Sequence, residues 1–149
     1  MQNIVIRDYS VRDFKEILEI DKEAFNPRNP AYDVYVYLTY GSDLLVADTG
    51  SKIVGYIVTM DVDRFTSKII SFAVRKEFRG MGIGKLLLKG AIKRLKMKGK
   101  RKIKLEVRVS NTYAQSLYKK FGFKTTDIIP GYYSDGEDAY IMVLHISEQ

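Results

Sequence analysis

Three glycines at alternate positions, Gly80, Gly82 and Gly84, separate a β-branched run from an amphipathic segment. The run at 68–74 (KIISFAV) predicts a strand, and the apolar residues of 82–97 recur with a helical period. A strand that leads through a glycine turn into a helix is typical of folds in which helices cover a sheet. This segment constrains the fold more than any other part of the chain.

The rest of the chain continues the alternation, and the predicted order is β-α-α-β-β-β-α-β-α-β-β. A capping box, Ser10 with Asp13, opens the first predicted helix, and Pro30 suits the first turn of the second. Because the chain has 149 residues, we expect one α/β (α+β) domain over residues 1–149 with a mixed sheet. Strands are predicted at 4–7, 43–48, 53–62, 68–74, 102–109, 123–129 and 139–146, and helices at 10–25, 30–40, 82–97 and 111–121. We expect Val11, Phe14, Ile17 and Leu18 on the apolar face of the first helix, and Ile83, Leu86, Leu87, Ala91 and Leu95 as core contacts of the third.

The composition excludes several kinds of site. The chain has no cysteine and one histidine, His145, so a thiolate centre, a cysteine nucleophile and a multi-histidine metal site are excluded, and we expect no metal. No apolar run approaches the ~20 residues needed to span a bilayer. The first residues, MQNIVIRDYS, lack the apolar stretch of a signal peptide. We therefore expect a cytoplasmic protein without a membrane partner.

Positive charge is concentrated in residues 75–104, which hold thirteen basic residues and one acid, Glu77. That segment carries +12, whereas the whole chain carries +7, so the remaining residues sum to −5. Such a segment favours a polyanionic partner, and a nucleic-acid-binding module is one hypothesis. The alternative is a lysine-rich helix face in contact with water, which composition alone favours.

The glycine turn has the properties of a phosphate site. The first N–H groups of the following helix have no partner inside the helix, and Arg79 and Lys85 add positive charge. Two well-known phosphate loops do not fit, since the P-loop requires glycine in place of Arg79, and the dinucleotide fingerprint requires glycine in place of Leu87. The alternative is a strand-to-helix turn without a ligand. The strand, the basic residues and the helix together favour a phosphate ligand.

Three blocks of sequence carry a resemblance to a known family. Arg79-x-x-Gly82-x-Gly84 after a strand is similar to the acyl-CoA loop of the GNAT superfamily of N-acetyltransferases. Downstream, 105–111 (LEVRVSN) and 132–139 (YYSDGEDA) resemble the RimI-type branch, which acetylates protein N-termini. The resemblance spans nearly the whole chain. The loop at 25–32 departs from the pattern of the bacterial members, in which it helps to form the substrate pocket.

The resemblance implies a GNAT-like sheet of six to seven strands, splayed between the fourth and fifth, with about four helices. It also implies acetyl-CoA as co-substrate, with the pantetheine arm pairing with exposed backbone of those two strands. A backbone N–H near Val74 would then polarise the thioester carbonyl. The residues expected to contact the cofactor are Val74, Arg79, Gly80, Met81, Gly82, Ile83, Gly84, Lys85, Asn111 and Tyr118.

Two side chains are candidates for proton transfer. Strand alternation separates Glu106 from its apolar neighbours, and the resemblance implies that it removes the proton of the acceptor amine. The alternative is an ordinary strand glutamate paired with Arg108 or with a nearby lysine. Tyr118 is the candidate acid for the departing thiolate, and its alternative is core packing. The resemblance implies acceptor contacts at Phe25, Tyr32, Tyr132 and Tyr133.

We therefore expect an acetyl-CoA-dependent N-acetyltransferase that transfers acetyl directly to a protein N-terminal α-amino group. The alternative within the superfamily is an enzyme that acetylates lysine side chains or small amines. The expected partner is a protein or peptide N-terminus, with ribosomal proteins or the ribosome among the candidates. A nucleic-acid partner is compatible with the basic segment but is not expected.

Overall fold

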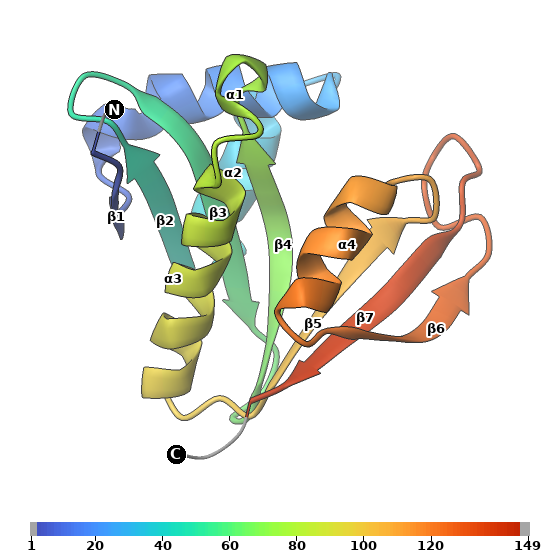
Figure 1. Ribbon diagram of the computed structural model, residues 1–149. Coiled ribbons are helices and arrows are strands. Elements are labelled where there is room, and N and C mark those ends of the chain that lie inside the picture. The colour runs from blue at the N-terminus through green and yellow to red at the C-terminus, as the bar shows by residue number, and fades with distance from the viewer. Residues whose placement is uncertain (1–2, 147–149) are drawn as a thin grey trace. The chain divides into compact units, whose positions relative to one another are not determined.

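The computed structural model describes residues 3–146, and its elements follow the predicted order (Figure 1). Each predicted strand and helix is found within a few residues of its predicted ends, which confirms the α/β class. The strands are β1 (Val5–Asp8), β2 (Asp43–Asp48), β3 (Ile53–Asp61), β4 (Thr66–Val74), β5 (Lys102–Arg108), β6 (Lys124–Ile129) and β7 (Ala139–His145). The helices are α1 (Phe14–Phe25), α2 (Pro30–Tyr40), α3 (Ile83–Met97) and α4 (Thr112–Lys120), with short 3-10 turns at Val11–Asp13 and Lys76–Phe78.

The strands form one seven-stranded sheet in the order β1-β2-β3-β4-β5-β7-β6. The pairs β1–β2, β2–β3, β5–β7 and β6–β7 are antiparallel, whereas β4 and β5 are parallel, so the sheet is mixed as predicted. The parallel ladder covers three residue pairs, from Thr66 with Lys102 to Lys68 with Lys104. A short ladder leaves backbone groups of both strands for other partners, as the resemblance predicts.

The chain folds into two compact units. The first comprises residues 1–61 and 69–95, and the second comprises residues 62–68 and 96–149. In the first unit, α1 and α2 lie on one face of the strands and α3 lies on the other (Figure 1). In the second unit, α4 lies in front of β5 in the view of Figure 1. Within residues 3–146, no helix combines the length and the apolar character that crossing a bilayer requires.

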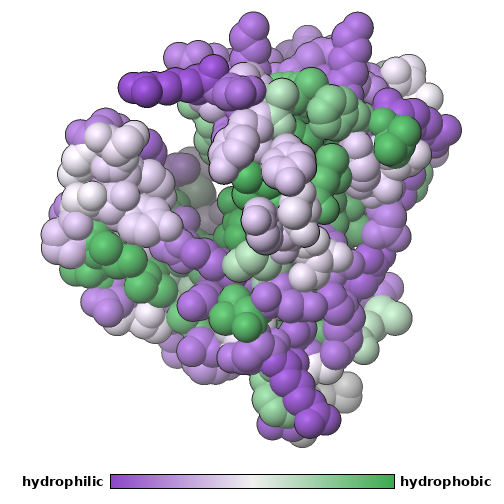
Figure 2. All heavy atoms as spheres, turned by 180° about the vertical axis from the view of Figure 1, so that it is seen from behind, coloured by the Kyte–Doolittle hydropathy of each residue, from purple (hydrophilic) through white to green (hydrophobic). Residues whose placement is uncertain are grey.

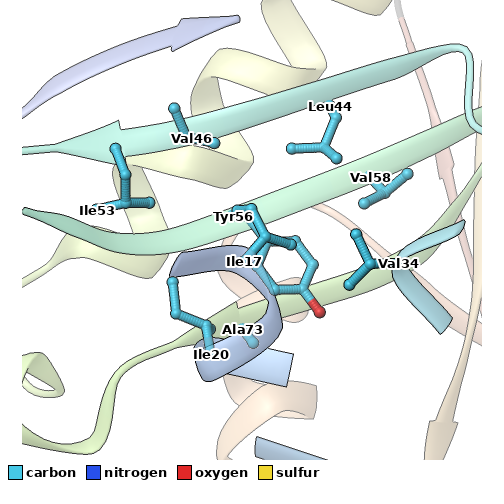
Figure 3. Close-up of a cluster of buried hydrophobic side chains, with 9 residues drawn as sticks. All are labelled: Ile17, Ile20, Val34, Leu44, Val46, Ile53, Tyr56, Val58 and Ala73. Atoms are coloured by element: carbon cyan, nitrogen blue, oxygen red, sulfur yellow. The ribbon is translucent and has the colours of Figure 1, made fainter. Parts of the chain in front are cut away.

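The core of the first unit is built where α1 and α2 face the strands. Ile17 and Ile20 of α1 and Val34 of α2 are fully buried, and they point toward apolar side chains of β2, β3 and β4 (Figure 3). Burying a side chain of this size contributes about 1.5–3 kcal/mol. The capping box lies just before α1, where the backbone N–H of Ser10 donates to Asp13 Oδ2 over 2.8 Å. These contacts fix where α1 and α2 lie on the sheet.

Three of the residues expected to face the core are exposed, and Phe14, the first residue of α1, is one of them at 37% exposed. Val11 is 85% exposed because it lies in the 3-10 turn that precedes α1, and the helical period begins only at Phe14. Leu86 is 41% exposed, whereas Leu88 is fully buried. The buried face of α3 therefore uses Leu88 in place of Leu86. Leu86 fits the helical period with Ile83 three residues before it, and Leu88 fits it with Leu95 seven residues after it, so the sequence alone did not distinguish them.

Candidate active site

The glycine turn lies in the first unit, between the end of β4 and the start of α3. Gly80 has φ of 80° and Gly82 has φ of 81°, a backbone conformation that L side chains rarely adopt. A Cβ built at either position meets no atom within 4 Å. Glycine is therefore required here by the backbone conformation, and the space around the turn is open.

The turn presents donors to that open space. Leu86 N donates to Gly82 O, so α3 begins at the turn and its first backbone N–H groups have no acceptor within the helix. The first turn of α3 contains no acid, and the Lys85 side chain is exposed. Arg79 is also exposed, and its Nε donates to Val74 O over 3.1 Å. These positive groups suit a phosphate ligand.

A buried arginine that we did not single out from the sequence holds the start of this turn. Arg75 is 6% exposed, and its Nε donates to Ile53 O over 2.7 Å. Its guanidinium also lies near Glu16 and Glu19 of α1, at 3.5 and 3.4 Å. The turn is therefore fastened to both β3 and α1. The sequence placed Arg75 in a basic run, which gives no sign that one member is buried.

Glu106 lies in the second unit, on β5, where the residues at 103, 105 and 107 are buried as the alternation predicted. Its Oε1 is 2.5 Å from Lys68 Nζ on β4 and accepts a hydrogen bond from the Tyr132 hydroxyl over 2.8 Å. The Lys68 side chain is 26% exposed and that of Glu106 is 12% exposed. Glu106 is thus paired with a lysine, one of the two pairings considered from the sequence, and it also contacts a predicted acceptor residue.

The loop between β6 and β7, residues 130–138, is fastened to the end of β5. Arg108 donates to Asp135 over 2.9 Å and to Glu137 over 2.8 Å, and its guanidinium lies 4.1 Å from the centre of the Tyr133 ring. The rings of Tyr132 and Tyr133 pack edge to face, 5.0 Å apart. Arg108 therefore pairs with the acids of the loop and not with Glu106, whose partner is Lys68. The sequence indicated the loop tyrosines but not the arginine that orders them.

Burial sets the protonation of two tyrosines of the second unit, Tyr132 and Tyr118. Burial and the hydrogen bond to Glu106 raise the pKa of Tyr132 to about 12. Burial also raises the pKa of Tyr118 well above its ordinary value, with a smaller contribution from Tyr133. Both phenols therefore stay protonated near neutral pH, and Tyr132 donates its proton in the hydrogen bond to Glu106. The same shift weakens Tyr118 as an acid, compared with the ordinary phenol assumed from the sequence.

Tyr118 and Asn111 both belong to α4 and its cap. The Asn111 side chain accepts a hydrogen bond from Ala114 N over 3.1 Å, so it caps the helix as its residue type predicts. Tyr118 is 7% exposed, and its ring lies 5.5 Å from that of Phe123. Tyr118 is therefore part of the core of the second unit, and its contact with a cofactor stays a prediction.

The remaining predicted acceptor residues flank the connection between α1 and α2 in the first unit. Phe25 is 50% exposed and Tyr32 is 61% exposed. The Tyr32 ring packs beside Tyr35, which is also exposed. Figure 2 views the face that holds α1 and α2, where pale and green atoms interrupt the hydrophilic surface. Both residues are available to a ligand, and neither is needed to fill the core.

Comparison with known proteins identifies the family. Residues 14–123 match the acetyltransferase (GNAT) family. The chain is 35% identical over 153 residues to an N-alpha-acetyltransferase of Sulfolobus acidocaldarius, covering 94% of this chain and 91% of that protein. It is 34% identical over 150 residues to the putative [ribosomal protein bS18]-alanine N-acetyltransferase of Bacillus subtilis, covering 96% of each.

Solved structures agree with this assignment. Ard1 from Thermoplasma volcanium superposes with a TM-score of 0.89 at 29% identity, covering 97% of this chain and 99% of that one. A GNAT family acetyltransferase from Elizabethkingia anophelis with acetyl-CoA bound superposes with a TM-score of 0.82 at 26% identity, covering 98% and 100%. The fold, the glycine turn and the extent of the match thus agree, and the chain belongs to the acetyltransferase (GNAT) family of N-acetyltransferases.

Proposed function

We propose that this protein transfers the acetyl group of acetyl-CoA to the N-terminal α-amino group of proteins or peptides. In this proposal, the turn at 79–85 binds the CoA diphosphate, and Glu106 takes the proton of the acceptor amine. Tyr118 donates a hydrogen bond to the departing thiolate. The observation that carries the proposal is the hydrogen bond between Tyr132 and Glu106. That bond places a loop suited to a peptide backbone beside the candidate base.

The chemistry favours an α-amine as acceptor. An α-amino group has a pKa of about 7.7–8.0, so roughly a tenth is free base at neutral pH, whereas a lysine side chain titrates near 10.4. One carboxylate is therefore sufficient base assistance for an α-amine. The amine nitrogen attacks the thioester carbon, the C–N bond forms and the C–S bond breaks. The amine loses a proton to Glu106 and the thiolate gains one, so the products are the N-acetylated chain and free CoA.

The named relatives support the α-amine as acceptor. One is an N-alpha-acetyltransferase and another is a putative ribosomal protein bS18-alanine N-acetyltransferase. Each is matched over more than nine tenths of its length. We extend the proposal to ribosomal protein N-termini as a substrate class. The exposed aromatic residues Phe25 and Tyr32 are proposed to contact the first side chain of the acceptor.

A peptide panel tests the proposal. Purified protein is incubated with acetyl-CoA and short peptides that differ in their first residue, and fragmentation mass spectrometry locates the acetyl group. We expect N-terminal acetylation and stoichiometric release of free CoA. As a matched control, the same peptides carry a blocked N-terminus and one internal lysine. Acetylation of the blocked lysine peptides or of polyamines, with none at free N-termini, would contradict the assignment.

A variant pair tests the peptide-binding loop. Replacing Tyr133 by Phe removes a phenol that is half-buried beside Arg108, and we expect the KM for peptide to rise while the KM for acetyl-CoA stays constant. Replacing the exposed Tyr113 of α4 by Phe is the matched control. An unchanged KM for peptide in the Tyr133 variant would argue against peptide binding by the loop.

A further inference from the structure

Lys68 is the one cation in contact with Glu106 among residues 3–146, and nothing in the sequence pattern marks it. We propose that Lys68 is a positioning residue for Glu106, and that with Tyr132 it holds Oε1 so that Oε2 takes the proton of the acceptor amine. This inference rests on the proposed function. It adds a residue of β4 to the acceptor site and gives the two oxygens of the carboxylate separate roles.

The contacts at the carboxylate are unequal. Oε1 has the ammonium of Lys68 at 2.5 Å and the hydroxyl of Tyr132 at 2.8 Å. Within residues 3–146, Oε2 accepts no hydrogen bond from a side chain or from the backbone. A carboxylate with two donors on one oxygen has a fixed rotation about its last torsion. The other oxygen is then oriented and has its lone pairs available to a proton.

The ladder explains why Lys68 is the partner. Lys68 is opposite Lys104 in the last pair of the β4–β5 ladder, and Glu106 lies two residues further along β5, on the same side of the alternation as Lys104. A lysine side chain is long enough to reach a diagonal neighbour on the adjacent strand. The next cation on that side of β5, Arg108, is engaged by Asp135 and Glu137 and does not compete.

Removing Lys68 changes more than one contact. The Glu106 side chain is 12% exposed, so without the ammonium its negative charge would be largely buried and uncompensated. Such a carboxylate takes up a proton more readily, and the protonated form is unable to act as a base. Lys68 therefore serves both the orientation of Glu106 and the compensation of its charge. A purely structural lysine would affect neither, and this difference defines the test.

The test compares Lys68→Met and Lys68→Arg with Lys104→Met. Methionine keeps the length of the stem without the charge, arginine keeps the charge, and Lys104 is the ladder partner of Lys68 that does not touch Glu106. The kcat and KM of each variant are measured between about pH 6 and pH 9 with the best peptide substrate. Circular dichroism and a thermal melt establish that each variant folds.

We expect Lys68→Met to lower kcat at neutral pH by about tenfold or more, as for a weakened general base. We expect the acidic limb of its kcat–pH profile to move to higher pH by about one unit. Lys68→Arg should restore the wild-type profile, and Lys104→Met should match the wild type. The KM for acetyl-CoA should stay within about twofold of wild type, since no proposed cofactor contact is changed. If Lys68→Met does not fold, Lys68→Gln, which keeps a polar donor without the charge, replaces it with the same expected result.

A folded Lys68→Met variant, or Lys68→Gln in its place, with an unshifted pH profile would overturn the inference. So would a loss of kcat that the arginine variant does not restore. These outcomes are distinct from a failure of the proposed function, which is read on the wild-type protein alone. If the wild type acetylates lysine side chains or small amines instead of N-termini, the same profiles are measured with that acceptor, and the role of Lys68 is decided independently.

Discussion

The hydroxyl of Tyr56 donates a hydrogen bond to Asp21 Oδ1 over 2.9 Å in the core, so β3 and α1 are joined by a buried polar contact. Tyr37 of α2 donates to the same oxygen over 2.7 Å. Because Tyr56 donates to Asp21, Ser71 of β4 is the donor in the 2.8 Å contact between the Ser71 and Tyr56 hydroxyls. Asp21 Oδ2 has no hydrogen-bond donor among the described residues, and Asp33 lies beside the carboxyl.

Asp21 should make stability fall as the pH rises. Burial raises the pKa of Asp21 above its ordinary value, and the neighbouring Asp33 adds to that shift. The folded protein therefore holds a proton that the unfolded chain has released, and this contribution is largest below the unfolded pKa and is lost as the pH rises through the folded pKa. We expect Asp21→Asn to remove it, so that the variant loses about 1 kcal/mol more, relative to wild type, at pH 4 than at pH 8. Urea unfolding at several pH values measures the difference.

Asp13 provides a control with the opposite sign. The hydrogen bond from Arg7 lowers the pKa of Asp13, so its contribution is present above the unfolded pKa and is lost as the pH falls through the folded pKa. Asp13→Asn should therefore cost about 1–2 kcal/mol at neutral pH and progressively less on acidification. Equal pH slopes for the Asp13 and Asp21 variants would contradict at least one of the two assignments.

Much of the fold follows from local patterns. The glycine turn, the alternation of β5 and the caps at Ser10 and Asn111 depend on residues close together in the sequence, and each is found where it was predicted. The splay between β4 and β5 was implied by the resemblance rather than by the patterns, and the order of the strands in the sheet required the structure. Patterns failed at Val11, which lies in a 3-10 turn before the helix, and at Leu86, where more than one helical face fits the apolar residues.

The partners in the site were not predictable in the same way. Lys68, Arg75 and Arg108 belong to a chain with 25 basic residues, most of which face solvent. Their roles depend on which acid lies opposite after folding, and those acids are distant in sequence, such as Glu106 for Lys68 and Asp135 for Arg108. The candidate catalytic residues were indicated by resemblance. The ion pairs that orient them required the structure.

Gly82 should be needed for cofactor binding and not only for folding. Gly82→Ala forces a side chain onto φ of 81°, which costs about 1 kcal/mol of stability and also places a methyl group at the proposed diphosphate site. Gly50→Ala is the matched control, since Gly50 has φ of 95° and open space in the β2–β3 turn. We expect similar losses of stability but a loss of acetyl-CoA affinity of about tenfold or more for Gly82 alone. Calorimetric titration with CoA measures the affinity of each variant. Equal affinities of the Gly82 and Gly50 variants would show that the cofactor does not bind at this turn.

Tyr118→Phe should lower kcat with little change in either KM. Its pKa is raised by burial, so the phenol acts as a donor to the thiolate rather than as a strong acid, and we expect a loss of about tenfold. Tyr113→Phe removes an exposed hydroxyl from the same helix and should have no effect. Rapid-quench kinetics with saturating substrates separate the transfer step from product release. A Tyr118 variant with full kcat would leave the residue a purely structural role.

Arg108→Lys should loosen the loop at 130–138 without unfolding the domain. Arginine reaches Asp135 and Glu137 through Nη1 while its planar guanidinium lies over Tyr133, whereas lysine has no planar group to stack on that ring. Both ion pairs are partly exposed, so the free energy of unfolding should change by less than about 1 kcal/mol. The backbone N–H groups of Tyr133 and Gly136, which donate to Glu137 O and Tyr133 O, should exchange with deuterium faster.

The same variant should raise the KM for peptide by about fivefold and leave the KM for acetyl-CoA unchanged, because the loop is proposed to bind the acceptor alone. Arg101→Lys is the matched control, since Arg101 also lies over an aromatic ring, 4.2 Å from the centre of Phe65, and precedes β5, at the opposite end of that strand from Arg108. Faster exchange in the loop with an unchanged KM for peptide would show that its order is irrelevant to acceptor binding. Slow exchange together with a raised KM would instead assign the effect to the lost guanidinium itself, because the loop would then be as ordered as in the wild type.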